Sequence, residues 1–339
     1  MEQTRYKIKS RGRIGFIDGD GEIAIEPQFL EADDFVRGYA RVKLNNKLVF
    51  MDELGRLYLK HFFNNLGYFN EGFARAQLVS KWGYINNKGD IHIPIRYDKA
   101  LDFSEGLAGV SIYGEVGYID VDGLIAIEPK FEEVGNFSFG RAPASKNAKW
   151  GYIDKSGDWI IEPTFDKAFP YEGETARIVQ GNKWGLIDDS GAMLTDVEFD
   201  IHAAKKEGVF DGDWAVFGKD GKYGYINKDG KIELEAQFEF ARPFTQNLAA
   251  VKSDGKFGYI HRDGSWFMKP TFQDALAFHK DVAPIRIDEY WGYITKDGRW
   301  MLEPAFSYAE TFKRNLAMVI EDDRWIYINR HGDIIWEGD

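Results

Sequence analysis

The sequence contains no cysteine, so it forms no disulfide and offers no thiol for catalysis or metal binding. It has no uninterrupted apolar run of about 18 residues, so we expect no membrane-spanning helix. The net charge is −12, and this negative field opposes binding to the phosphates of nucleic acids. The start of the chain, from Met1 to Tyr6, lacks the apolar core of a signal peptide, so we expect a cytoplasmic protein.

Proline is scarce, whereas glycine and aromatic residues are abundant. The 339 residues include 10 Pro and 36 Gly, and aromatic residues make up 16% of the chain. This mixture is typical of many short strands joined by tight turns. The composition therefore favours an all-β protein.

One segment recurs along the whole chain, and residues 149–154 (Lys-Trp-Gly-Tyr-Ile-Asp) are a clear copy of it. We number each copy from its Gly, or from the residue in its place, as position zero. Successive zero positions lie 34 residues apart in eight intervals and 39 residues apart in one. Position zero is occupied in the ten copies by Gly15, Val49, Gly83, Gly117, Gly151, Gly185, Gly224, Gly258, Gly292 and Ile326. The sequence therefore predicts a single array of ten repeats over residues 1–339.

Each repeat has the pattern of a β-hairpin. Position 6 is Gly in all ten repeats, as in Gly123, and a Gly between two strands favours a turn with positive φ. Pairing across a three-residue loop predicts position 2 opposite position 8, and zero opposite 10. The Gly and Ile side chains would then share one face, and the Trp and Tyr side chains the other. A third strand near position 25 leads into the next Trp-Gly strand.

We therefore expect an all-β tandem array of ten three-stranded antiparallel units, with each sheet covered on both faces by stacked neighbours. An open, solenoid-like superhelix is the first expectation, because 34 residues are few for a four-stranded blade. A closed, propeller-like ring is the alternative. Repeats 2 and 6, which are counted from Val49 and Gly185, depart most from the pattern, so we expect them to share the geometry least.

The Lys-Trp-Gly-Tyr-Ile-Asp segment, the turn Gly, an Ile-x-Ile-x-Pro strand and a Phe-x-x-Gly-x-Ala-x-Val run resemble the WG repeat family of bacterial proteins. The resemblance covers essentially the full chain. It implies a shared architecture, and the family implies no single biochemical activity.

The ten Trp residues and the charged residues follow the repeat. Five Trp lie at position −1, and the positions of most of the others hold aliphatic residues in other repeats, which predicts core packing instead of a stacking platform. We expect Trp82, Trp150, Trp184 and Trp291 to be buried. Position −2 is basic in eight repeats and position 11 is Glu in six, which predicts cross-strand ion pairs. A regularly spaced charged surface for an extended partner is the alternative.

No motif points to catalysis, a cofactor or a metal. The six His residues fall at six different phases of the repeat, and residues 227–232 imitate a calcium loop whose first and last ligand positions would be Tyr225 and Ala236. Nucleophile-elbow, phosphate-loop and dinucleotide motifs are missing from the sequence. We expect a non-enzymatic scaffold that binds a protein or peptide and needs no cofactor. A module for glycans or envelope material, and a hydrolase with its site in an irregular repeat, are the alternatives.

The break in the period predicts a candidate partner site. Five extra residues fall within residues 200–213, and insertions in repeat proteins form loops that often carry binding function. His202, Lys205, Lys206 and Trp214 are the residues that we expect to contact the partner. Drift in a degenerate repeat is the simpler explanation of the insertion.

Overall fold

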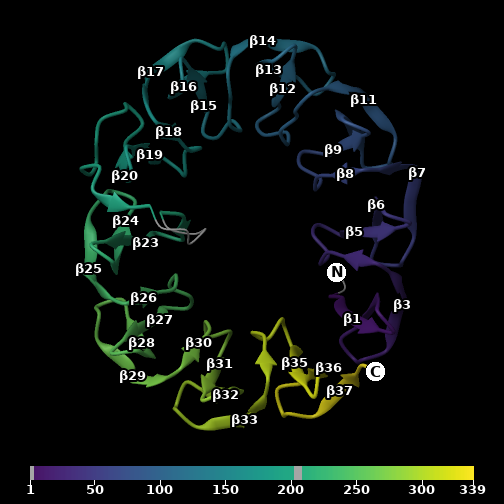
Figure 1. Cartoon of the computed structure of the whole chain (residues 1–339), viewed down its shortest axis with the longest axis vertical. Coiled ribbons are helices and arrows are strands. Elements are labelled where there is room, and N and C mark those ends of the chain that lie inside the picture. The colour runs from purple at the N-terminus through teal and green to yellow at the C-terminus, as the bar shows by residue number, and fades with distance from the viewer. Residues whose placement is uncertain (1–3, 202–207) are drawn as a thin grey trace. The chain divides into compact units, whose positions relative to one another are not determined.

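The computed structural model describes residues 4–201 and 208–339, and these residues form 37 β-strands joined by turns. Among them, no helix is long and apolar enough to cross a membrane. The strands form ten small antiparallel sheets in chain order, which confirms the predicted all-β repeat array (Figure 1).

The bounds of the strands follow the repeat. The first five sheets contain β1 (Tyr6–Ser10), β2 (Arg13–Ile17) and β3 (Ile23–Phe29); β4 (Glu31–Ala32), β5 (Tyr39–Leu44), β6 (Lys47–Asp52) and β7 (Leu57–Phe63); β8 (Asn65–Leu66), β9 (Phe73–Leu78), β10 (Lys81–Asn86) and β11 (Ile91–Tyr97); β12 (Ala108–Ile112), β13 (Glu115–Ile119) and β14 (Ile125–Phe131); and β15 (Arg141–Lys146), β16 (Lys149–Asp154) and β17 (Trp159–Phe165). The other five contain β18 (Lys167–Ala168), β19 (Ala176–Gln180), β20 (Lys183–Ile187) and β21 (Phe199–Asp200); β22 (Phe210–Asp211), β23 (Trp214–Lys219), β24 (Lys222–Asn227) and β25 (Ile232–Phe238); β26 (Phe240–Ala241), β27 (Leu248–Ser253), β28 (Lys256–His261) and β29 (Trp266–Phe272); β30 (Asp274–Ala275), β31 (Val282–Ile287), β32 (Tyr290–Thr295) and β33 (Trp300–Phe306); and β34 (Tyr308–Ala309), β35 (Ala317–Glu321), β36 (Arg324–Ile328) and β37 (Ile334–Glu337).

The array divides into two compact units. Unit 1 holds residues 4–7 together with Gly12–Phe16 and Ala24–Val197. Unit 2 holds Ile8–Arg11, Ile17–Ile23 and the described residues after Val197.

Seven sheets have a fourth strand that the sequence pattern does not predict. This strand has two residues, as in β4 and β26. It lies at one edge of the sheet and pairs with the longer strand that follows it in the chain, which is β5 or β27 in these two sheets. In the sheet β12–β14 the single bridge between Ala100 and Val110 stands in its place. The expectation of three strands was too low because two residues are too few to give an alternating apolar pattern.

The hairpin pairing departs from the predicted register at position zero. In β16 and β17, Ile153 at position 2 pairs with Trp159 at position 8, as expected. Tyr152 at position 1, and not Gly151, is opposite Ile161 at position 10, because a β-bulge shifts the register. The Tyr side chain therefore shares a face with the position-10 Ile, so the predicted division of the faces was wrong.

The bulge also explains why position zero is Gly. A Cβ on Gly83 would lie 2.6 Å from the carbonyl oxygen of Ile93 and 2.8 Å from the Cα of Ile95. No larger residue fits such a close approach of two backbones without moving one of them. Position zero of repeat 2 is Val49, and there Phe50 pairs with Tyr58 at position 9 instead of position 10. This difference confirms that repeat 2 departs from the shared geometry.

Repeat 6 departs as well. After its turn an isolated bridge joins Ile187 to Met193, and the two-residue strand β21 replaces the seven-residue second strand of most other repeats. The hydroxyl of Thr195 accepts a hydrogen bond from the backbone N–H of Leu186 at 3.0 Å.

The core lies between successive sheets. One buried cluster joins Tyr118, Ile127 and Phe131 of repeat 4 to Ala144 and Ile153 of the next sheet. A second cluster joins Tyr84 and Ile93 of the preceding sheet to Val110 and Ile119 of the sheet β12–β14, so both faces of this sheet are covered by its neighbours, as predicted. The buried Tyr at position 1 adds a hydrogen bond to the residue 17 positions later, and the six pairs at 2.7–2.8 Å are Tyr84–Leu101, Tyr118–Gly135, Tyr152–Phe169, Tyr225–Arg242, Tyr259–Leu276 and Tyr293–Glu310.

The first and last repeats contact each other within unit 2. The Ser10 hydroxyl donates a hydrogen bond to the Asp339 carboxylate at 2.6 Å. A Cβ on the turn residue Gly21 would lie 2.8 Å from Cγ2 of Ile335, much as a Cβ on Gly55 would meet Ile25 one repeat further along.

Candidate functional site

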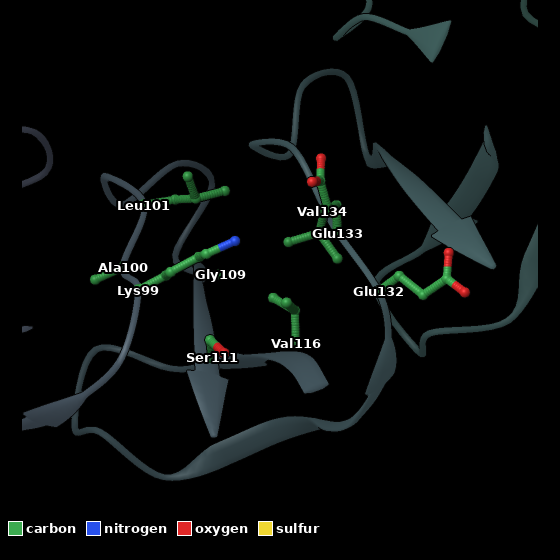
Figure 2. A pocket seen from close by; sticks show the side chains of 9 residues that line it. All are labelled: Lys99, Ala100, Leu101, Gly109, Ser111, Val116, Glu132, Glu133 and Val134. Carbon is green, nitrogen blue, oxygen red and sulfur yellow. The ribbon is translucent and has the colours of Figure 1, made fainter. Parts of the chain in front are cut away.

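A pocket with a volume of about 190 Å³ opens in unit 1 beside the sheet β12–β14. Lys99 and Leu101 lie on one side of it and Glu133 and Val134 on the other, with Val116 between them (Figure 2). The remaining lining residues are Ala100, Gly109, Ser111 and Glu132. Its walls are therefore mostly apolar, and charged groups line its rim.

The pocket exists because repeat 4 has a small residue at position −1. Val116 of β13 pairs with Ser111, and in the next sheet Trp150 pairs with Ser145 in the same register. Trp150 is 8% exposed, so its indole fills the corresponding space in repeat 5. Val116 leaves that space open.

A second small residue shapes the other end of the pocket. Gly109 of β12 stands where the equivalent strands carry Arg75, Pro143 or Arg177. A Cβ on Gly109 would lie 2.8 Å from Val134 Cγ2 and 3.0 Å from Leu101 Cδ1. These two side chains therefore close over Gly109 and form the apolar end of the pocket.

The charges around the pocket also differ from those in repeat 5. In repeat 5 the Lys149 ammonium lies 2.5 Å from the Asp166 carboxylate, and this hydrogen bond lowers the pKa of Asp166. Repeat 4 has Glu115 in place of that lysine and Glu132 in place of that aspartate. The Glu132 carboxylate accepts hydrogen bonds from the backbone N–H groups of residues 147 and 148, at 3.0 and 2.8 Å.

Repeats 4 and 5 also differ in the charge at position 16. In repeat 5 the Lys167 ammonium lies over the Trp150 ring, 4.6 Å from its centroid. In repeat 4 the same position is Glu133. Within the described residues, neither the Glu133 carboxylate nor the Lys99 ammonium has an ion-pair partner. The pocket thus has an acidic rim on one side and a single lysine on the other.

The lysine-to-position-11 ion pairs predicted from the sequence are mostly replaced by others. Lys81 and Lys149 pair with Asp98 and Asp166, both at position 15. The bulge causes this, because it places position −1 opposite position 14 and so brings position −2 near position 15. The predicted pairing with position 11 occurs in repeat 10, between Arg324 and Glu337.

The predicted burial of the Trp residues is confirmed at most of the named positions. Trp150, Trp184 and Trp291 are buried, and Trp82 is half-buried. The core prediction was wrong at position 8, where Trp266 is 37% and Trp300 42% exposed. Position 8 is near the start of the strand after the turn, on the edge of its sheet, so neighbouring sheets cover it incompletely.

Three of the four residues predicted to contact a partner, His202, Lys205 and Lys206, lie outside the described residues. Trp214 begins β23 and is half-buried. Its ring meets Phe244 edge-on at a centroid distance of 5.2 Å, and the Arg262 guanidinium lies 4.7 Å from its centroid. Trp214 therefore packs within unit 2, and its role in partner binding stays a prediction.

Among the residues that the structure describes, no three His, Asp or Glu side chains lie close enough together to bind a metal ion. The Val116 pocket offers apolar walls, the ammonium of Lys99 and the carboxylates of Glu132 and Glu133. This arrangement can bind a flat apolar group with a charged neighbour. The pocket was not predicted from the sequence, although Glu115-Val116 is the one place where a Lys-Trp pair is replaced by an acidic residue and a small aliphatic residue.

The family model of the WG containing repeat matches residues 14–47, 82–115, 117–150, 150–184, 223–257, 257–291 and 291–325. The chain belongs to this family. The WG repeat matches leave out repeats 2, 6 and 10, and repeats 2 and 6 are the ones where the sequence and the strand pairing depart most. WG repeat arrays are in general binding scaffolds, and the family match does not specify a partner.

Comparison with curated proteins gives no match. Among solved structures, the chain is similar to a eukaryotic initiation factor, with 11% identity, a TM-score of 0.55, and 99% of this chain and 96% of that chain covered. This likeness shows the fold alone. The dihydro-heme d1 dehydrogenase NirN has 13% identity and a TM-score of 0.41, with 99% of this chain and 73% of that chain covered. Kluyveromyces lactis Hsv2 has 9% identity and a TM-score of 0.38, with 74% and 89% covered.

Proposed function

We propose that this WG repeat chain is a non-enzymatic scaffold that binds a protein or peptide partner, with the Val116 pocket as a point of contact. The pocket is the observation that supports this proposal. Its volume of about 190 Å³ is below the roughly 300–1,000 Å³ of sites that enclose a whole small molecule. It has room for one side chain of a larger partner.

The polar groups of the pocket favour binding over catalysis. A nucleophile needs a base within hydrogen-bond reach, and among the described residues the buried Ser111 hydroxyl makes no hydrogen bond to a basic side chain. Two charged groups on the rim, Lys99 and Glu133, are exposed to solvent. An exposed lysine and an exposed glutamate can set the orientation of a bound peptide through its charges.

A selection of random peptides displayed on phage against the full chain tests the proposal. We expect enriched peptides whose binding is lost in Val116→Trp, which fills the pocket with the residue found at this position in other repeats. Phe257→Trp makes the same kind of change at position −1 of repeat 8 and is the matched control. Failure to enrich any peptide would contradict the proposal, as would enriched peptides that bind both variants equally.

A second candidate function, glycan binding, is supported by one observation. Trp266 and Trp300 are exposed at the same position of successive repeats in unit 2, and sugars stack on exposed aromatic rings. A glycan array probed with the full chain and with a Trp266→Ala, Trp300→Ala variant tests this function. Glycan signals that persist in the double variant would remove its support.

A further inference from the structure

We infer that the Val116 pocket binds the indole ring of a tryptophan in the partner, with a basic residue beside that tryptophan. This inference rests on the proposed function and specifies the chemistry of the partner. The repeat itself supplies the template, because other repeats place a Lys-Trp pair at the positions where repeat 4 has Glu115-Val116.

The size and position of the pocket match an indole. Trp150 occupies the equivalent space in repeat 5, where it is paired with Ser145 as Val116 is paired with Ser111. An engineered apolar cavity of about 150 Å³ binds benzene, so a pocket of about 190 Å³ has room for an aromatic ring. The pocket is thus a vacated tryptophan site open to an external ring.

The walls provide the contacts that a buried indole makes elsewhere in this chain. Leu101, Val116 and Val134 supply apolar surface. The Lys99 side chain reaches toward the pocket from the opposite side to Glu133 (Figure 2). A lysine ammonium close to an indole face is attractive, and Lys167 already makes this contact with Trp150.

The rim selects a basic neighbour for the tryptophan. Glu115 precedes Val116 where Lys149 precedes Trp150, and Glu133 replaces Lys167. The Glu133 carboxylate lies at the pocket without an ion-pair partner among the described residues, so a cation of the partner meets no competing cation on that side. Glu115 and Glu133 stand where repeat 5 has two lysines, so the partner supplies the positive charge at this pocket.

The partner is a different molecule and not a second copy of this chain. The tryptophans that follow a basic residue in this sequence belong to strands that are paired within their own sheets, and they are Trp82, Trp150, Trp184, Trp300 and Trp325. Trp300 is the exposed one at 42%, and the guanidinium of its neighbour Arg299 is already paired with the Asp297 carboxylate. An exposed Lys-Trp or Arg-Trp segment of another protein is free of both constraints.

Binding of short probes to the full chain tests the inference, with ligand-observed NMR as the readout. The probes are N-acetyl-Lys-Trp-amide, N-acetyl-Lys-Leu-amide and N-acetyl-Glu-Trp-amide. We expect saturable binding of the Lys-Trp probe with a Kd on the order of 0.1–1 mM, a typical affinity for so few buried atoms. The Lys-Leu probe should bind at least about tenfold more weakly, and the Glu-Trp probe several-fold more weakly at low salt.

Two pairs of variants locate the site. Val116→Trp should abolish binding of the Lys-Trp probe, and Val116→Phe serves if the first variant does not fold, because Phe257 shows that this position accepts Phe. The control Phe257→Trp should bind like the unmodified chain. Glu133→Gln should remove most of the preference for Lys-Trp over Glu-Trp while indole binding persists.

The inference is overturned by equal binding of the Lys-Leu and Lys-Trp probes, by undiminished binding to a folded Val116→Trp variant, or by no saturable binding below about 10 mM. The result also separates this inference from the proposed function. Phage selection that enriches peptides without aromatic residues would overturn the indole site and leave the scaffold function standing. Binding of the Lys-Trp probe, combined with a phage selection that enriches no peptide, would overturn the scaffold function and leave the indole site standing.

Discussion

Repeats 4 and 5 lie next to each other in unit 1 and share the same strand pairing, yet they use position −1 differently. In both, position 1 is a buried Tyr whose hydroxyl donates to a backbone carbonyl 17 residues later. Repeat 5 fills the space beside this strand with Trp150, whereas repeat 4 leaves it open at Val116. The backbone of the repeat therefore does not depend on the tryptophan after which the family is named. A single repeat can replace this tryptophan with a smaller residue and so form a pocket.

Alkaline pH should have the largest effect, and it should act on both repeats alike. Burial raises the pKa of Tyr118 and of Tyr152 above the ordinary value of 10.0. The folded-state pKa is thus higher than the unfolded one, so this stabilisation is complete below pH 10 and is lost as the pH rises further. Each such Tyr lowers the free energy of unfolding by up to about 1.4 kcal/mol for each pH unit above 10.

Denaturant unfolding followed between pH 8 and pH 11.5 measures this loss. A double variant with Phe at both Tyr positions should show a shallower decline. The same slope in the variant would contradict the assigned burial.

Replacing Trp150 with Val gives repeat 5 the residue of repeat 4. We expect a loss toward the lower end of the roughly 3–5 kcal/mol that truncation of a large buried aromatic residue costs, because a cavity replaces the indole. Urea titration measures the change, with Trp266→Val, at an exposed site, as the control. A cost below about 1 kcal/mol would show that Trp150 contributes little packing and would weaken the comparison.

The turn glycines should be equally sensitive in both repeats. Gly123 and Gly157 have φ values of +79° and +83°, and a Cβ would meet Ile93 or Ile127 of the preceding repeat at 3.2 or 2.5 Å. Gly123→Val should cost about 1–3 kcal/mol, because a β-branched side chain is strained at positive φ. Thermal unfolding of the two Gly→Val variants provides the measurement. A neutral effect of either substitution would mean that its turn relaxes to another conformation.

The tyrosine hydroxyls should contribute the smallest and most uniform effect. Tyr118→Phe and Tyr152→Phe each remove one hydrogen bond, to the carbonyls of Gly135 and Phe169. We expect a loss of about 1 kcal/mol in each case at pH 7. Urea midpoints of the two variants should agree, whereas a clear difference would show that the open pocket weakens the packing around Tyr118.

The repeat, its period, the turn glycines and the pairing of position 2 with position 8 could be predicted from the sequence, because each depends on local patterns. The bulge could not be predicted, because it depends on how closely Gly83 approaches Ile93 in space. The same shift redirected Lys149 from position 11 to Asp166. The exposure of Trp300 depends on which strand forms a sheet edge, and the pattern within one repeat does not contain that information.

The pocket was visible in the sequence only as an exception. Glu115-Val116 breaks the Lys-Trp pattern, but a missing tryptophan is filled by neighbouring side chains in many proteins, since protein interiors pack closely. Whether the space closes depends on Leu101 and Val134, which meet over Gly109 and leave the Val116 end open. The positions of these side chains in space decide whether the pocket stays open, and the sequence pattern does not contain them.

A crystal structure of the full chain soaked with N-acetyl-Lys-Trp-amide, together with one of the Val116→Trp variant, tests the central claim most directly. The account predicts probe density with its indole between Lys99 and Val134 in the first crystal. In the second, the introduced side chain should occupy the same space, in the orientation of Trp150 in repeat 5. A collapsed pocket in the first crystal, or an introduced indole that turns out into solvent in the second, would contradict the claim that repeat 4 holds a vacated tryptophan site.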